Sequence, residues 1–182
     1  MHFAFCLYKH FPYSGLSLDM LRIANECTQR GHKATVFTGS WEGEVPDGVE
    51  VVIIKHFALT NHTRAHTFHR KLRKHLDTHE FDVVVGFNKI PGLDIYYCGD
   101  YCYVGRSFLR HSFFYRFTPR FLYFSSFERG VFDASSRTNI LSLSDREKLI
   151  YQQYYLPRYL LLGRCFERWR LKYHRILKLA CH

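Results

Sequence analysis

The sequence lacks several features that mark other classes of protein. Its 182 residues contain no apolar run near the ~18 residues that a membrane-spanning helix requires, so no such helix is expected. The first eight residues are apolar but have neither a basic start nor a small-residue cleavage site, which argues against a secretory signal. None of the six cysteines forms a C-x-x-C pair, and this favours reduced thiols in a cytosolic protein.

The composition is that of a folded chain. Apolar residues make up 47% and aromatic residues 18%, which is incompatible with disorder, and the length suits one compact domain. The net charge of +10 is concentrated at the end, because residues 156–182 hold seven Lys or Arg and one acid. We therefore expect a domain over residues 1–155 and a basic tail over 156–182, and no nucleic-acid partner on the basis of overall charge.

Strand and helix patterns alternate through the first 155 residues. Short apolar runs predict six strands, and helical spacing follows three of them, the last helix opening at Ser144 with Glu147 in a capping-box position. Strands separated by helices predict an α/β fold, a Rossmann-like doubly wound and mainly parallel sheet in which ligands bind beyond the carboxyl ends of the strands. The predicted strands are 3–8, 34–38, 49–54, 82–87, 95–98 and 139–143, and the predicted helices are 16–30, 62–79 and a last one after 144.

The first strand–helix junction is a candidate phosphate site. Ser14 and Gly15 stand at this junction, where a glycine allows the backbone of a helix N-terminus to approach a phosphate. A single glycine also simply makes a turn, and the absence of G-x-G-x-x-G argues against a dinucleotide. Asp19, one turn into the helix, would hold a sugar hydroxyl or only compensate the helix dipole.

Three polar residues follow later strands. Asn88 and Lys89 come after the fourth predicted strand and Asp100 after the fifth, so all three point to the same edge of the sheet. The alternative is that they serve only loop solvation and turn chemistry.

Histidines crowd residues 56–79, which raises the question of a metal site. His62, His66 and His69 would share a helix face, but no Cys or acid stands at matching spacing. We therefore favour a solvated helix and expect no metal.

Residues 103–132 interleave arginines with aromatic residues, and Glu128 is their only acid. This pattern is typical of contact with an anionic membrane surface. A helix that packs its aromatic residues on the sheet is equally compatible, and stacking on single-stranded nucleic acid is less so. The candidate membrane contacts are Arg106, Arg110, Phe113, Phe114, Tyr115, Arg116 and Arg120.

Several segments together resemble a known family. The combination of Ser40-Trp41-Glu42-Gly43 with a G-F-N-K-x-P-G-L-D motif over residues 86–94 is similar to the lipopolysaccharide core glucosyltransferase I family. That family belongs to glycosyltransferase family 4 and has the GT-B fold, with two Rossmann-like domains facing across a cleft. The resemblance covers about residues 1–155, so this chain is expected to match the N-terminal half of the fold.

The resemblance implies a reaction and its substrates. The family transfers glucose from UDP-glucose to a heptose of the lipopolysaccharide inner core, with retention of configuration and without a metal or other cofactor. Its N-terminal domain binds mainly the acceptor, and a basic, aromatic helix of that domain touches the anionic inner membrane. A peripheral location on the cytoplasmic side of that membrane is therefore expected.

The same resemblance implies residue roles. Gly15 would approach the donor diphosphate, with Ser14 replacing one of the family's two glycines. Asp19 and Asp100 would line the cleft between acceptor and donor as catalytic residues. The remaining substrate-binding positions implied by the shared motifs are Trp41, Glu42, Asn88 and Lys89.

The chain departs from the family after Tyr155. The family continues there with an apolar strand and a Pro-Pro-Gly turn, whereas residues 156–182 are rich in arginine. Our hypothesis is that this tail is frameshifted or otherwise non-native, that the donor domain is missing, and that the chain alone is inactive. The alternatives are a separate partner chain that supplies the donor domain, or a non-catalytic Rossmann-like module that binds an anionic membrane or a partner protein.

Overall fold

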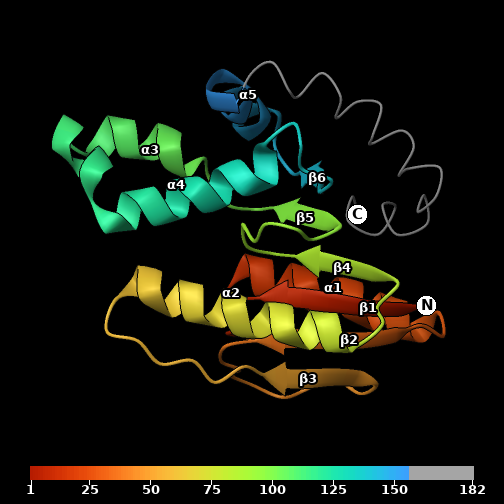
Figure 1. Ribbon diagram of the computed structural model, residues 1–182. Coiled ribbons are helices and arrows are strands. Elements are labelled where there is room, and N and C mark those ends of the chain that lie inside the picture. Colours follow the sequence, from red (N-terminus) through yellow and green to blue (C-terminus); the bar gives the residue numbers. More distant parts are fainter. Residues whose placement is uncertain (156–182) are drawn as a thin grey trace.

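The computed structural model describes residues 1–155, and the predicted basic tail, 156–182, lies outside the described residues. The described chain forms one six-stranded sheet in the order β3-β2-β1-β4-β5-β6, and every pairing is parallel (Figure 1). The strands are β1 (His2–Leu7), β2 (Lys33–Thr38), β3 (Val49–Ile53), β4 (Val83–Gly86), β5 (Ile95–Cys98) and β6 (Asn139–Ser142). The helices are α1 (Gly15–Gln29), α2 (Asn61–Thr78), α3 (Tyr103–Arg110), the 3-10 helix η1 (Phe113–Phe117), α4 (Pro119–Phe132) and α5 (Asp145–Tyr155).

This strand order confirms the Rossmann-like prediction. The order in which strands are added reverses between β1 and β4, which are parallel, hydrogen-bonded neighbours in the centre: the chain builds outward from β1 to β3 on one side and then from β4 to β6 on the other. Both strands are nearly continuous runs of apolar residues, as strands covered on both faces must be. The crevice above such a reversal point is where open α/β sheets bind ligands.

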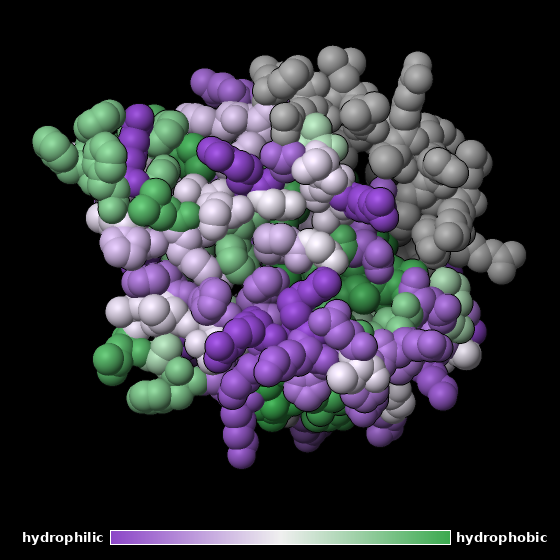
Figure 2. Space-filling model, viewed as in Figure 1, coloured by the Kyte–Doolittle hydropathy of each residue, from purple (hydrophilic) through white to green (hydrophobic). Residues whose placement is uncertain are grey.

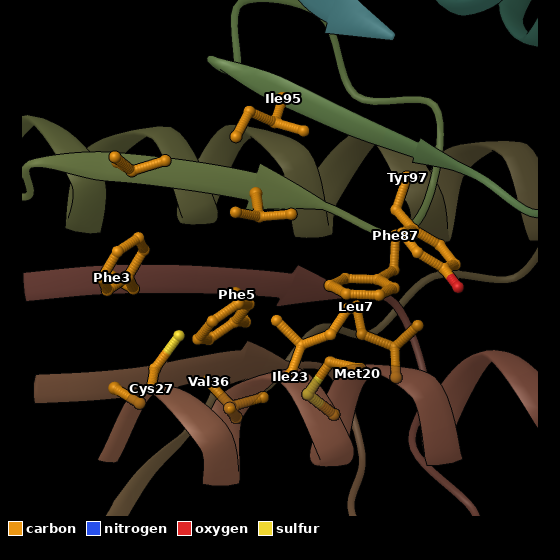
Figure 3. Close-up of a cluster of buried hydrophobic side chains, with 14 of the residues drawn as sticks. Phe3, Phe5, Leu7, Met20, Ile23, Cys27, Val36, Phe87, Ile95 and Tyr97 are labelled. Atoms are coloured by element: carbon orange, nitrogen blue, oxygen red, sulfur yellow. The ribbon is translucent and has the colours of Figure 1, made fainter. Parts of the chain in front are cut away.

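Helices cover both faces of the sheet. Met20, Ile23 and Cys27 of α1 pack on Phe3 and Phe5 of β1, and these side chains interdigitate in the larger core cluster (Figure 3). On the other face, Phe68 and Leu72 of α2 pack on Ala4 and Cys6, and α4 packs on β5. The outward face around α2 is strongly hydrophilic (Figure 2), which agrees with the solvated helix expected for residues 62–79.

The arginine- and aromatic-rich segment is divided into three helices where the sequence indicated one continuous stretch. Thr118 caps α4, and Pro119 occupies its first turn, so α4 begins as a new helix after η1. The last helix begins after Ser144 as expected, and the Ser144 hydroxyl accepts a hydrogen bond from the Glu147 N–H at 3.5 Å. The Glu147 carboxylate points to another partner and accepts a hydrogen bond from the Cys102 N–H at 3.4 Å.

Candidate functional site

The centre of the site is the carboxyl edge of β1 and β4. The Asn88 side-chain oxygen accepts a hydrogen bond from the Tyr8 N–H at 2.6 Å, and this contact joins the two strand ends at the reversal point. Gly86 ends β4 with no room for a side chain, since a Cβ there would lie 2.5 Å from Leu93 Cδ1. The loop that carries Asn88 and Lys89 is therefore held close to β1.

A cavity of about 290 Å³ opens beside this junction, between α2 and α4. Its polar edge is formed by residues that follow β1, β4 and β5, and its walls are aromatic and aliphatic side chains of the two helices. The polar edge holds Tyr8, Asn88, Lys89 and Asp100, and the walls include Phe68, His69, Tyr123, Phe124 and Phe127. Mostly apolar walls with a few convergent polar groups are typical of small-molecule sites.

Two polar atoms of the cavity walls are buried without a partner. The Tyr123 hydroxyl and His69 Nε2 have no hydrogen-bond partner among the described residues. Burial raises the pKa of the Tyr123 hydroxyl and lowers the pKa of the His69 imidazole, so both groups are neutral at pH 7. Because buried polar atoms are rarely left unpaired, a ligand bound in the cavity is the natural partner for both atoms.

Asp100 is a half-buried residue on the polar edge of the cavity. Burial is the main cause that raises its pKa, and the Lys89 ammonium and the Asn88 side chain act in the opposite direction. A carboxylate with a raised pKa is a stronger proton acceptor than an exposed one when it is ionised. The three residues predicted to share an edge, Asn88, Lys89 and Asp100, thus lie together in the structure.

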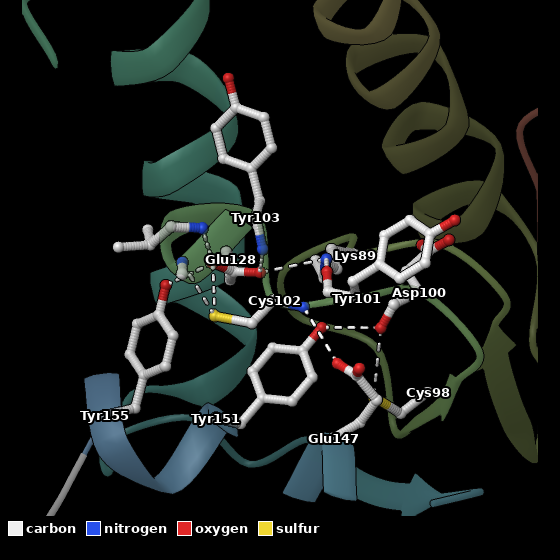
Figure 4. A network of polar contacts seen from close by, with 12 residues as sticks. Lys89, Cys98, Asp100, Tyr101, Cys102, Tyr103, Glu128, Glu147, Tyr151 and Tyr155 are labelled. Carbon is white, nitrogen blue, oxygen red and sulfur yellow. Dashed lines mark hydrogen bonds and ion pairs between the residues drawn. The ribbon is translucent and has the colours of Figure 1, made fainter. Parts of the chain in front are cut away.

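Lys89 belongs to an internal polar network (Figure 4). Its ammonium lies 3.0 Å from the Glu128 carboxylate and donates to the Tyr101 carbonyl oxygen at 2.5 Å. Glu128, on α4, is fully buried and accepts hydrogen bonds from the N–H groups of Tyr103 and Val104 at 2.6 and 2.9 Å. The charge of Lys89 therefore holds α4 and the start of α3 against the loop that carries Asp100.

Ser14 and Gly15 lie at the start of α1, on the carboxyl edge. The Ser14 hydroxyl caps the helix by accepting a hydrogen bond from the Ser17 N–H at 3.4 Å, and a Cβ built on Gly15 would meet no heavy atom within 4 Å outside its chain neighbours and the adjoining helix backbone. The first N–H groups of a helix have no acceptor within the helix, so this open end is suited to an anion. It adjoins the end of β5, since a Cβ on Gly99 would lie 2.8 Å from Leu16 Cδ1.

Asp19 lies one turn further along α1. Its carboxylate accepts a hydrogen bond from the Tyr97 hydroxyl at 3.0 Å and is 3.7 Å from the Arg22 guanidinium. Asp19 contributes nothing to the cavity wall between α2 and α4, because α1 covers the other face of the sheet. The two predicted catalytic carboxylates therefore stand on different sides of the strand ends.

Trp41 and Glu42 form a third group on the same edge. The Trp41 ring stacks on the buried His10 imidazole at 3.8 Å between centroids, and the His10 Nδ1 lies 3.1 Å from the Glu42 carbonyl oxygen. The Glu42 carboxylate is exposed and is 3.4 Å from the Lys9 ammonium. Both residues lie outside the lining of the cavity, over the ends of β1 and β2.

The clustered histidines do not assemble a metal site in the part of the chain that the structure describes. Over residues 1–155, no group of three or more His, Cys, Asp or Glu side chains is arranged to hold a metal ion. His66 and His69 instead pack edge-on against Tyr123 and Phe127 of α4, at 5.9 and 4.9 Å between ring centroids.

The candidate membrane contacts divide into exposed and internally engaged residues. Phe113, Phe114, Arg110, Arg116 and Arg120 are exposed, and the Arg116 guanidinium lies 4.0 Å from the centroid of the Phe108 ring. Tyr115 and Arg106 are half-buried. The Tyr115 hydroxyl lies 3.0 Å from the Tyr103 hydroxyl, and the Arg106 guanidinium lies over the Tyr101 ring. None of the helices described over residues 1–155 is both long and apolar enough to cross a bilayer.

Sequence reasoning missed four residues that the structure places in the site. Tyr8 and Tyr123 were not candidates because they lie far apart in the sequence, and His69 was considered only as a metal ligand on a helix face. Glu128 carried a signal, as the only acid in residues 103–132, but nothing in its spacing indicated Lys89 as its partner.

Three comparisons bear on this geometry. Residues 13–158 match the model of Glycosyltransferase Family 4. Over 152 residues the chain is 40% identical to the lipopolysaccharide glucosyltransferase WaaG of Escherichia coli (strain K12), a match that includes 84% of this chain and 41% of the relative. The crystal structure of WaaG, a glycosyltransferase involved in lipopolysaccharide biosynthesis, superimposes with a TM-score of 0.81 at 40% identity, again with 84% and 41% coverage.

These similarities confirm the resemblance drawn from the sequence motifs and the Rossmann-like fold of a GT-B protein. The chain spans 41% of the length of the relatives named. The boundary expected between residues 155 and 156 stays a prediction.

Proposed function

This chain belongs to glycosyltransferase family 4, and we propose that it is the acceptor-binding domain of a lipopolysaccharide-core glucosyltransferase. The observation that carries the proposal is the cavity between α2 and α4, at the reversal point of the sheet. A sugar presents C–H groups on its ring faces and hydroxyls around its rim. The aromatic walls of the cavity would pack against the ring faces, and the polar groups at its edge would form hydrogen bonds with the hydroxyls. The acceptor that we propose for this cavity is a heptose of the inner core.

Asp100 is the residue that we propose to touch the reacting hydroxyl. Its carboxylate lies on the polar edge of the cavity, and its raised pKa suits it to accept a hydrogen bond, and then the proton, from that hydroxyl. Asn88 would orient the acceptor beside it. Lys89 acts as a positioning residue, because its ammonium is held by Glu128 and the Tyr101 carbonyl and fixes the loop that carries Asp100.

The donor in this proposal is UDP-glucose, and no metal or other cofactor takes part. The open N-terminus of α1 would receive the diphosphate at Gly15, with the Ser14 cap holding the helix start in place. Asp19 would bind a hydroxyl of the donor sugar, and Trp41 and Glu42 would border the same edge. Residues 1–155 supply one sheet, so the remaining donor contacts would come from a second Rossmann-like domain.

We also propose that the protein is peripheral on the cytoplasmic face of the inner membrane. Phe113 and Phe114 are exposed at 60% and 78%, with Arg110, Arg116 and Arg120 exposed around them. Exposed aromatic rings enter the headgroup region while arginines pair with anionic lipid phosphates. This arrangement would bring the cavity to the membrane in which the lipid-linked acceptor sits.

A reconstitution assay tests the catalytic proposal. The purified chain, a separately expressed donor domain of the WaaG relative, and heptosylated core lipid would be mixed with radiolabelled UDP-glucose. We expect transfer to the lipid only when both proteins are present, and loss of transfer with Asp100→Asn. Glu44→Gln, an exposed carboxylate in the loop after β2, is the matched control and should transfer normally.

The second candidate function is a non-catalytic module that binds an anionic membrane or a partner protein. The exposed aromatic and arginine side chains favour it independently of the cavity. Vesicle binding together with no transfer in the reconstituted mixture, and no binding of heptosylated lipid headgroup to the chain, would select this alternative.

A further inference from the structure

Two exposed apolar clusters stand out on the surface, and only one of them lies in the arginine- and aromatic-rich segment. The η1 cluster consists of Leu109, Phe113, Phe114 and Phe117, each at least 60% exposed. The loop cluster consists of Phe57 and Leu59, in the connection between β3 and α2, at 87% and 92% exposed. Single exposed apolar side chains are common on protein surfaces, but neighbouring ones that form a patch mark interaction sites.

The packing of α2 on α4 places both clusters at the same end of the molecule. His66 contacts Tyr123 and His69 contacts Phe127, so the two helices run in the same direction with a nearly constant offset in numbering. That register sets Asn61, the first residue of α2, level with the start of α4. The loop cluster immediately precedes α2, and the η1 cluster immediately precedes α4.

The figures agree with this register. The connection from β3 to α2 and the turn from α3 to α4 lie on the same side of the ribbon, toward which the strand arrows point (Figure 1). Hydrophobic surface gathers at these two places on that side, with the hydrophilic face of α2 nearby (Figure 2). The cavity lies between the two places, since Asn61 and Arg64 line it from α2 and Tyr123 and Phe124 from α4.

The chain segments that carry the two clusters hold charges of one sign. Residues 51–76 contain six Lys or Arg and no acid, and residues 101–127 contain four Arg and no acid. Protein–protein interfaces tend to exclude charged residues from their centres, whereas anionic phospholipid surfaces attract clustered cations around inserted apolar side chains. Two separate apolar tips among cations therefore favour a lipid surface over a protein partner.

We propose that Phe57 and Leu59 form a second membrane contact, which enters an anionic phospholipid surface together with the η1 cluster. The two contacts straddle the mouth of the cavity and turn the carboxyl edge of the sheet toward the bilayer. This inference rests on the proposed membrane contact of the η1 cluster but concerns a different loop, so the two can fail separately.

Tryptophan substitution with brominated lipid tests each contact directly. Leu59→Trp and Phe114→Trp would be prepared in the full chain, with the unmodified chain giving the emission of its own two tryptophans. Vesicles would contain 70% phosphatidylcholine, brominated on the acyl chains, and 30% phosphatidylglycerol. We expect a blue shift and quenching of the added tryptophan in both variants.

Each other outcome is decisive. Quenching at residue 114 without quenching at residue 59 overturns the second contact and leaves the first intact. Quenching at residue 59 alone would place the loop in the membrane but overturn its joint entry with the η1 cluster, and quenching at neither residue overturns both contacts.

Binding strength gives an independent readout. Phe57→Ser with Leu59→Ser should lower vesicle partitioning by at least about fivefold, because two apolar side chains no longer leave water. The matched control is Leu18→Ser with Leu149→Ser, which removes two exposed leucines from α1 and α5. Equal partitioning of the two double variants would overturn the proposal, and unchanged thermal unfolding of both would show that the fold is intact.

Discussion

The Glu128 carboxylate lies 3.0 Å from the Lys89 ammonium, and the two side chains are 0% and 13% exposed. This ion pair joins α4 to the loop after β4, and the same carboxylate accepts hydrogen bonds from the first N–H groups of α3 and from the Tyr155 hydroxyl. One buried acid thus ties together the segment that carries the exposed aromatics and the loop that carries Asn88.

Glu128→Gln should destabilise the protein by about 3 kcal/mol, because it leaves the nearly buried Lys89 ammonium without its counter-charge. The measurement is urea unfolding of the full chain at pH 7. Glu26→Gln is the matched control. Its partner Arg30 is partly exposed, so the free energy of unfolding should fall by less than about 1 kcal/mol. Adding Lys89→Met to Glu128→Gln should recover part of the loss, and strict additivity would contradict a direct pairing.

Asp100 should make stability depend on pH in the direction opposite to that of a salt-bridged carboxylate. Burial raises its pKa in the folded state, so the folded chain holds a proton at pH values where the unfolded chain has released it. Stability is therefore lost as pH rises from the ordinary aspartate value through the raised one. Asp100→Asn should flatten this part of the profile of melting temperature against pH, while Asp47→Asn, at an exposed carboxylate, should leave it unchanged.

Tyr123→Phe should separate stability from binding. The hydroxyl is buried without a partner among the described residues, so its removal should raise stability by up to about 1 kcal/mol. If this hydroxyl bonds the acceptor sugar, the variant should bind heptosylated headgroup about tenfold more weakly. Tyr103→Phe, which breaks the 3.0 Å contact with the Tyr115 hydroxyl, should instead lose stability in the same thermal measurement. A less stable Tyr123→Phe variant would show that the hydroxyl has a partner in solution.

Which features could be predicted from the sequence depends on how far apart in the chain the interacting residues lie. The strands and the helices α1, α2 and α5 were predictable because apolar runs, helical spacing and caps such as Ser144 are local patterns, whereas the division of residues 103–132 into α3, η1 and α4 was not predicted. Asn88, Lys89 and Asp100 could be grouped because carboxyl ends of parallel strands share one edge. The pairing of Lys89 with Glu128, and the cavity wall formed by His69 and Tyr123, depend on how α4 packs against α2, which no local spacing encodes.

Gly15→Ala should leave the fold intact while impairing donor use. A Cβ at this position meets no atom within 4 Å, and alanine favours the helix, so stability should stay equal or rise by less than about 1 kcal/mol. Gly105→Ala is the contrasting variant, since its Cβ would lie 2.7 Å from Tyr154 Cε2 and should cost about 1–3 kcal/mol. If Gly15 admits the diphosphate, Gly15→Ala should slow glucose transfer in the reconstituted mixture. Glucose transfer at the normal rate by a stable Gly15→Ala protein would show that the diphosphate does not bind at the start of α1.

The exposed arginines should make membrane binding sensitive to salt in a position-dependent way. Each arginine near an anionic surface contributes about 1 kcal/mol, so Arg110→Gln with Arg116→Gln should weaken binding to phosphatidylglycerol vesicles by roughly 30-fold at low salt. The control, Lys33→Gln with Arg137→Gln, removes the same charge from exposed positions at the amino ends of β2 and β6. Partitioning by vesicle sedimentation at 50 and 300 mM salt would compare them. If net charge alone drives binding, both double variants will bind more weakly by the same factor. If the η1 surface contacts the lipid, only Arg110→Gln with Arg116→Gln will lose both affinity and salt dependence. The reason is that Arg110 and Arg116, unlike the control residues, would lie within a Debye length of the headgroups.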